Sequence, residues 1–205
     1  RGVLRSDEKT KISEVAVPAG VVFGLVPVTN PVATAIFKTL IALKARCALI
    51  LSFHRACLGV GNVTCEIMMQ VLREHGAPEN IVQWVKARGS RAKTVKFMGH
   101  PDVSLVLATG GAGMVRAAYS SGTPALGVGP GNAPAYIAAD ADVAMASYAV
   151  IVSKPFDNGL ICGGEHNLVV DAAVRDAFTG GLEQQGAAVL NADETKAFLA
   201  KAVDP

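Results

Sequence analysis

Short apolar runs recur along the chain, and each of them ends at a loop rich in Gly, Pro, Ser or Asn. The first covers residues 21–26, between Gly20 and Pro27, and this pattern is typical of a strand buried on both faces. Similar runs predict further strands at residues 48–51, 81–85, 105–108 and 125–128. The pattern therefore predicts at least five short strands in the first two thirds of the chain.

Amphipathic stretches separate these runs. Over residues 32–46, Ile36, Leu40 and Leu43 repeat at helical spacing, whereas Lys38 marks a polar position. Helices are likewise predicted at residues 62–75, at residues 90–98, and from the Thr109–Gly113 loop to about residue 121. Strands that alternate with helices predict an α/β fold, with a parallel sheet covered by helices on both faces.

Beyond Pro134 the pattern changes to a helix at 140–152, a strand at 168–170 and a helix at 172–185. Glycine and proline cluster just before this point, which predicts a domain boundary there. We therefore divide the chain into an edge segment or linker at residues 1–16, a sheet domain at 17–132, and part of a second α/β domain at 133–205.

Composition and charge exclude several classes of protein. The 205 residues are 51% hydrophobic, and 19 basic residues stand against 17 acidic ones, so no nucleic-acid footprint is visible. The longest apolar run, residues 15–28, is broken by Gly and Pro and falls short of the roughly 18 residues of a membrane span. The four cysteines lack metal-site spacing, so we expect no metal and reduced thiols in a cytoplasm. Both ends look cut, because the chain begins with Arg and stops in an acidic-proline tail.

Parallel sheets bind ligands at the carboxyl ends of their strands, so the loops after the strands are the places to search. Thr109-Gly110-Gly111 precedes a helix and is suited either to a diphosphate or to close packing of helix on strand. Asn30 is suited either to stabilising an oxyanion or to capping the following helix. The loop from Gly127 to Gly131 lacks the spacing of a dinucleotide fingerprint and favours a tight turn.

Cys162 is the candidate nucleophile. Gly159 before it and Gly163-Gly164 after it leave room for a substrate at the sulfur, whereas a structural cysteine is usually flanked by bulky apolar residues. From the local pattern alone, an inert buried thiol remains an alternative.

Four ordered motifs together resemble the CoA-acylating aldehyde dehydrogenases of the aldehyde dehydrogenase superfamily. They are Pro27-Val28-Thr29-Asn30-Pro31, the stretch from Ala108 to Val115, the stretch from Gly127 to Pro134, and the stretch from Phe156 to Cys162. The resemblance runs from about Val17 to Asp171. It implies an NAD(P)-binding domain of five strands without the usual fingerprint, followed by part of the catalytic domain, in a chain less than half as long as the family's.

The same resemblance implies roles for individual residues. Cys162 would be the nucleophile, and Asn30 with the backbone amide of Cys162 would form the oxyanion hole. The implied cofactor-binding residues are Thr29, Ser52, His54, Arg55, Thr109, Gly110, Gly111 and Gly127. The family's usual proline between the equivalents of His54 and Arg55 is absent.

Gly127 lies where hydrolytic members of the superfamily carry a glutamate that activates water. The implied reaction therefore joins an aldehyde, NAD or NADP, and CoA as co-substrate, and yields acyl-CoA. The alternatives are a truncated, non-catalytic nucleotide-binding module and a hydrolytic enzyme for which Glu165, expected in an exposed loop, is the only nearby carboxylate. We expect a cytoplasmic homo-oligomer in the full-length form, or one in a bacterial microcompartment, with neither nucleic acid nor membrane as partner.

Overall fold

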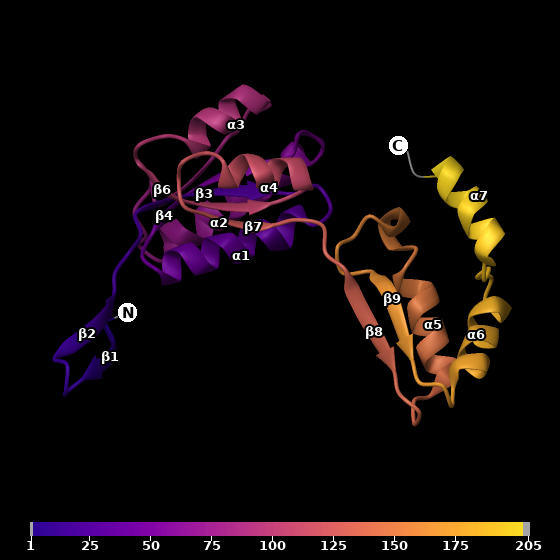
Figure 1. The fold of residues 1–205 in the computed structure, drawn as a ribbon. Coiled ribbons are helices and arrows are strands. Elements are labelled where there is room, and N and C mark those ends of the chain that lie inside the picture. Colours follow the sequence, from indigo (N-terminus) through magenta and orange to yellow (C-terminus); the bar gives the residue numbers. More distant parts are fainter. Residues whose placement is uncertain (1, 203–205) are drawn as a thin grey trace. The chain divides into compact units, whose positions relative to one another are not determined.

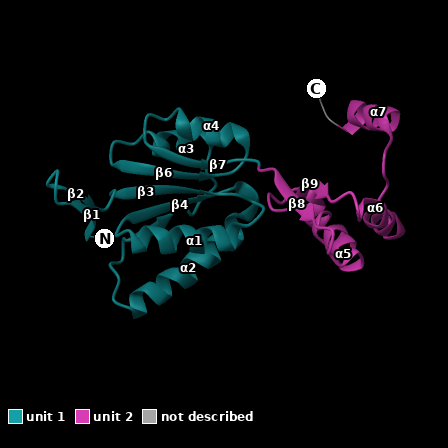
Figure 2. Ribbon diagram, turned by 60° about the horizontal axis from the view of Figure 1, so that its bottom comes forward, with its two compact units in different colours: residues 1–130 teal, residues 131–205 magenta. Residues whose placement is uncertain are grey.

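The computed structural model describes residues 2–202, which form two compact units that divide between Pro130 and Gly131 (Figure 2). The first unit is built on a sheet of five parallel strands in the order β5-β4-β3-β6-β7. Figure 1 labels four of these strands, β3, β4, β6 and β7. The strands are β3 (Val21–Val26), β4 (Ala48–Phe53), β5 (Val82–Trp84), β6 (Val103–Thr109) and β7 (Ala125–Val128). The prediction of an α/β fold with a parallel sheet is confirmed.

Helices cover both faces of this sheet (Figure 2). One face carries α1 (Pro31–Lys44) and α2 (Leu58–Glu74), and the other carries α3 (Arg91–Met98) and α4 (Ala112–Tyr119). The short helix η1 (Arg55–Cys57) leads from β4 into α2. The start of α2 was predicted four residues too late, at residue 62, because Gly59 and Gly61 lie in its first turns and weaken the helical pattern.

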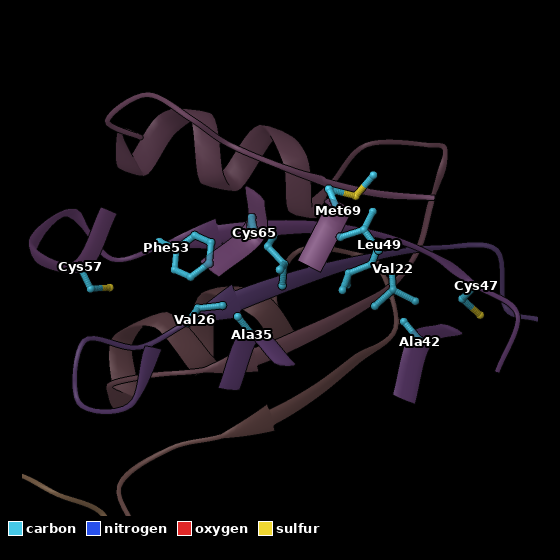
Figure 3. Close-up of a cluster of buried hydrophobic side chains, with 12 residues drawn as sticks. Val22, Val26, Ala35, Ala42, Cys47, Leu49, Phe53, Cys57, Cys65 and Met69 are labelled. Carbon is cyan, nitrogen blue, oxygen red and sulfur yellow. The ribbon is translucent and has the colours of Figure 1, made fainter. Parts of the chain in front are cut away.

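Side chains of successive strand residues point to opposite faces, so each face has its own core. Val22 and Val26 of β3 pack with Ala35, Ala42, Cys65 and Met69 of α1 and α2 (Figure 3). Phe23 and Leu25 pack toward α3 and α4, where the ring of Phe23 stacks on Phe97 at 5.2 Å between centroids. The strand is therefore buried on both faces, as its apolar run predicted.

The buried face of α1 differs from the predicted one. Leu40 is exposed, whereas Lys38 is 3% exposed and lies in the core between sheet and helix. The buried side chains of α1 are Ala35, Lys38, Thr39 and Ala42, which also repeat at helical spacing. The prediction was wrong for Ile36 and Leu40, which are exposed, because small residues mark the side that packs closely on the sheet. Leu43 packs against the core, as predicted.

The second unit pairs two parallel strands, β8 (Ala133–Ile137) and β9 (Glu165–Val170). Its helices are α5 (Val143–Ser153), η2 (Phe156–Gly159), α6 (Arg175–Gln184) and α7 (Ala192–Ala202). No strand was predicted at β8, where Pro134 interrupts the apolar pattern. A two-stranded sheet tolerates this proline because both of its strands are edges.

Residues 1–16 were interpreted as an edge segment or linker, and the described part of them forms a hairpin of β1 (Gly2–Asp7) and β2 (Ile12–Ala16). The Asp7 carboxylate accepts a hydrogen bond from the Lys9 amide at 2.8 Å and thereby closes the turn, and this bond lowers the pKa of Asp7. Within residues 2–202 no helix combines the length and the apolar character needed to cross a membrane.

Candidate functional site

The residues predicted in the first unit converge on one edge of the sheet, where all five parallel strands end. Strand register places Ser52 of β4 opposite Leu25, Leu25 opposite Ala108, and Ala108 opposite Gly127 of β7. Three inter-strand spacings of about 4.8 Å put Ser52 and Gly127 roughly 14 Å apart along this row. Backbone hydrogen bonds join the ends of adjacent strands. The His54 N–H donates to the Val26 carbonyl, and the Gly110 N–H donates to the Val128 carbonyl, each at 3.1 Å.

The sheet grows first on one side of β3 and then on the other. From β3 the chain adds β4 and β5 on one side, and it then returns to place β6 and β7 on the other. Open α/β sheets bind their ligands at such a point, outside the carboxyl ends of the two strands where the growth of the sheet changes side. Thr29 and Asn30 lie after β3, and Thr109, Gly110 and Gly111 lie at the end of β6.

Asn30 occupies the N-cap position of α1, yet its side chain makes no capping hydrogen bond to any residue that the structure describes. Pro31 follows at the first helical position, where its lack of an N–H costs nothing. Asn30 is exposed, so its amide remains available to donate to a ligand. Of the two interpretations of Asn30, the geometry favours a hydrogen-bond donor to an oxyanion over an ordinary helix cap.

Gly111 is the N-cap of α4 and has an extended backbone. A Cβ built on Gly111 would meet no heavy atom of residues 2–202 within 4 Å, and one on Gly110 would lie an ordinary 3.7 Å from Met114. Close packing of helix on strand therefore does not require glycine at either position. The open space and the free amides at the start of α4 suit an anionic group such as a diphosphate.

A pocket of about 260 Å³ lies between α3 and α4. It is on the face of the sheet toward which Leu25 and Ala108 point. It is lined by Arg91, Thr94, Val95, Met98, Gly113, Met114 and Ala117. Gly113 and Ala117, four residues apart on α4, leave room for it. The sequence pattern did not predict this pocket. The small residues at that spacing were its one available signal.

Of the predicted cofactor-binding residues Ser52, His54 and Arg55, His54 has a local hydrogen-bond partner. Ser52 and Phe53 belong to β4 rather than to its exit loop, and Ser52 is 8% exposed. The Nδ1 atom of His54 accepts a hydrogen bond from the Ala56 amide at 3.3 Å and caps η1, while Arg55 is exposed. Strand β4 extends further than predicted because its last residues also pair with β3.

Cys162 lies in the second unit, in the loop that leads into β9. It is exposed, whereas Cys47, Cys57 and Cys65 are buried. Burial raises the pKa of Cys57, and burial together with the charge of Glu66 raises that of Cys65 to about 12. An inert buried thiol is therefore a poor description of Cys162.

The backbone before Cys162 is strained. Asp157, Asn158 and Gly159 all have positive φ, at 51°, 54° and 72°. A left-handed conformation costs roughly 1 kcal/mol or more at a residue with a side chain, and such positions cluster at functional sites. After the cysteine, a Cβ on Gly163 would meet no described heavy atom within 4 Å. The thiol is thus presented from a tight turn with open space beside it.

Two polar residues that follow Cys162 in the sequence, Glu165 and His166, differ in their hydrogen bonding. His166 accepts a hydrogen bond from the Ala133 amide at 3.3 Å and so links β9 to β8. Glu165, expected in an exposed loop, is the first residue of β9 and is half-buried. One of its carboxylate oxygens is buried and has no hydrogen-bond partner among residues 2–202.

Lys38 is a buried cation that the sequence pattern placed on a polar face. Its Nζ donates to the Leu107 carbonyl at 2.6 Å, and burial lowers its pKa to about 8. It packs against Gly24, where an added Cβ would lie 3.2 Å from the Lys38 Cδ. Lys38 thus packs against β3 and β6, the two strands at the centre of the sheet from which the Asn30 and Gly110 loops emerge.

We expect Lys38 to make the stability of the first unit rise with pH. Its folded pKa of about 8 lies below the ordinary 10.5, so the unfolded chain binds more protons between these values. Relative to Lys38→Met, the wild type should gain about 1 kcal/mol in free energy of unfolding between pH 7 and pH 9. Urea titrations followed by the fluorescence of Trp84 would measure it, with Lys44→Met as the exposed control on α1. A difference that does not change with pH would contradict the buried ammonium.

Comparison with known proteins gives a consistent result. The model of the Aldehyde dehydrogenase family matches residues 2–197. Aldehyde-alcohol dehydrogenase 2 of Entamoeba histolytica is 44% identical over 200 residues, which cover 98% of this chain and 23% of that protein.

Two solved structures are also similar. An acetylating aldehyde dehydrogenase from Geobacillus thermoglucosidasius has a TM-score of 0.80 and 42% identity, over 97% of this chain and 44% of that chain. A propionaldehyde dehydrogenase from Rhodopseudomonas palustris, solved with bound propionyl-CoA, has a TM-score of 0.77 and 30% identity, over 93% and 42%. The present chain thus spans less than half of each relative. With nearly all of its length matched, the chain belongs to the aldehyde dehydrogenase family.

Proposed function

We propose that the full-length protein oxidises an aldehyde with NAD(P) and transfers the acyl group to CoA. The exposed thiol of Cys162, held beyond a strained turn, is the observation that carries this proposal. The names of the relatives support it, since one is an acetylating aldehyde dehydrogenase and another was solved with propionyl-CoA.

The thiolate of Cys162 adds to the carbonyl carbon and forms a C–S bond, and Asn30 donates a hydrogen bond to the resulting alkoxide oxygen. NAD(P), when bound, supplies the hydride acceptor for the oxidation. Cys162 then holds the acyl group as a thioester. The thiolate of CoA attacks the carbonyl carbon, the bond to the Cys162 sulfur breaks, and Cys162 leaves as a thiolate.

The first unit has suitable places for a dinucleotide. We propose that its diphosphate lies at Gly110 and Gly111, because these residues are open and precede the N-terminus of α4. The pocket between α3 and α4 would accept the adenine, since apolar side chains line most of it. Thr29, Ser52, His54, Arg55 and Gly127 remain proposed contacts on the same edge of the sheet.

We also propose a homo-oligomer in the cytoplasm. All four cysteines are unpaired, which fits a reducing compartment. Val3, Leu4, Ile12 and Val15 of the hairpin are exposed and supply apolar surface for association. A microcompartment remains the second proposed location.

The proposed reaction predicts that turnover depends on CoA. The full-length protein should reduce NAD(P) with an aldehyde continuously when CoA is present, and stop after about one equivalent per active site when it is absent. Absorbance of NAD(P)H and chromatography of the product would measure this. Equal rates without CoA, with free acid as the product, would contradict acyl transfer. Binding of NADH without any thioester on Cys162 would instead indicate a nucleotide-binding module.

A further inference from the structure

The loops that follow the five parallel strands of the first unit lie at one edge of the sheet and carry no carboxylate side chain. Asp and Glu are absent from residues 15–65, 80–101 and 103–139, and every one of these loops falls within those ranges. The acidic residues of the first unit lie in the β1–β2 hairpin, on α2, and in the loops before β5 and β6. At the carboxyl edge, a ligand hydroxyl therefore finds no side-chain carboxylate of this unit as its acceptor.

Basic residues occupy the same edge. Arg55 follows β4, Arg88 and Arg91 follow β5, and all three residues are exposed. None of the ion pairs among residues 2–202 includes any of these three guanidinium groups. The edge therefore presents a positive field that attracts an anionic ligand.

Both ends of the loop between β5 and α3 are anchored. The indole N–H of Trp84 donates to the side-chain oxygen of Asn62 at 3.0 Å, and the Asn62 amide donates to the Lys86 carbonyl at 3.4 Å. At the other end, the Ser90 hydroxyl accepts a hydrogen bond from the Lys93 amide at 3.2 Å and caps α3. A ligand that binds beside this loop therefore does not have to order it first.

Arg91, the first residue of α3, lines the pocket between α3 and α4. Among the described residues that line this pocket, Arg91 carries the only charge. The arginine does not stabilise its own helix, because a positive charge in the first turn opposes the helix dipole. Lys96 lies in the last turn of α3, where the dipole favours a cation. The charge of Arg91 thus has no structural role in α3 and is free to bind a ligand in the pocket.

The geometry of the first unit brings the ribose of a bound adenosine close to Arg91. Helices α3 and α4 both begin at the carboxyl edge of the sheet, since each follows a parallel strand. Gly110 and Gly111 come just before α4, and Gly113 in its first turn lines the pocket. A dinucleotide with its diphosphate at the first two glycines and its adenine in the pocket has the adenosine ribose between them. Arg91 lies at this same end of the pocket.

NAD and NADP differ only by a phosphate on the 2′-oxygen of this ribose. In many doubly wound dinucleotide-binding sheets, an acidic residue accepts a hydrogen bond from the 2′-hydroxyl of NAD, whereas an arginine accommodates the 2′-phosphate of NADP. The planar guanidinium group matches two phosphate oxygens at once. We propose that Arg91 binds the 2′-phosphate of the adenosine ribose, so that the protein selects NADP over NAD. This inference rests on the proposed function and specifies its cofactor.

Fluorescence titration of the full-length protein with NADPH and with NADH tests the proposal. The wild type should bind NADPH at least about tenfold more tightly than NADH. Arg91→Met should weaken NADPH binding about 10–100-fold, as expected for the loss of one charge-assisted contact, and change NADH binding less than about threefold. Lys96→Met is the matched control, because it removes the same charge from the far end of the same helix, and it should leave both affinities unchanged. Arg91→Lys should keep part of the preference.

CoA also carries a phosphate on its adenosine ribose, at the 3′-oxygen, so a second arm separates the two sources. In displacement of NADPH, 2′,5′-ADP should bind at least about tenfold more tightly than 5′-AMP, and 3′,5′-ADP should resemble 5′-AMP. Equal binding of NADPH and NADH, equal effects of Arg91→Met and Lys96→Met, or stronger displacement by 3′,5′-ADP would overturn the proposal. Binding of neither dinucleotide would refute the proposed function and this inference with it. A preference for NADPH in a protein that forms no acyl-CoA would refute the proposed function alone.

Discussion

Replacing Cys162 by serine should lower turnover of the full-length protein on the order of 10⁴-fold or more, since the nucleophile that forms the thioester is removed. The folded structure should tolerate the change, because the side chain is exposed and lies in a loop. Mass spectrometry after incubation with aldehyde and NAD(P), but without CoA, should locate one acyl group on Cys162 in the wild type and none in the variant.

Cys47→Ser is the matched control. Cys47 is buried before β4, at the edge of the sheet opposite to the candidate site, and its sulfur donates to the Ala45 carbonyl at 3.6 Å. Serine can make the same bond, so turnover should remain close to that of the wild type. Near pH 8, iodoacetamide should modify Cys162 well before the three buried thiols. An acyl group on another residue, or full turnover by Cys162→Ser, would refute the assignment.

Replacing Asn30 by alanine should lower kcat by about 10²–10³-fold, the usual effect of removing one donor from an oxyanion hole. Stability should change little, because the Asn30 side chain caps no amide of α1 in the described structure. Steady-state kinetics and thermal unfolding of the same preparation would separate the two effects. Asn30→Asp, which keeps the shape and loses the donor, should be as impaired as the alanine variant.

Asp142→Ala provides the converse control. Asp142 is a true N-cap, because its carboxylate accepts from the Met145 amide at 3.0 Å at the start of α5. Its loss should cost about 1 kcal/mol of stability and leave kcat nearly unchanged. If Asn30→Ala instead destabilised the protein and left kcat intact, Asn30 would be an ordinary cap with no part in the reaction.

The sequence predicted the five strands of the parallel sheet because each is a short apolar run bounded by loop residues. It also predicted that Asn30 and Thr109 lie at one edge, since parallel strands all end on the same side of a sheet. It failed at Gly61, which interrupts the helical pattern of α2. An added Cβ there would lie 2.5 Å from the ring of Phe53, so packing explains this glycine within a helix.

The buried face of α1 could not be predicted in the same way. Leu40 and Lys38 have the expected character for an apolar and a polar face, and the structure reverses them. Close approach of α1 to the sheet selects small residues, and the long side chain of Lys38 fills the remaining gap while its ammonium reaches the Leu107 carbonyl. Local hydrophobicity contains no information about how closely two elements approach.

The sequence by itself determined the α/β class, the family of the chain and the candidate residues, because apolar periodicity and ordered motifs are local properties. Only the tertiary structure decided that Asn30 leaves its helix uncapped and that Arg91 lines a pocket between α3 and α4. Each of these facts depends on contacts, or on open space, between separate elements of the fold. Such contacts are set by packing and register, which no single segment specifies.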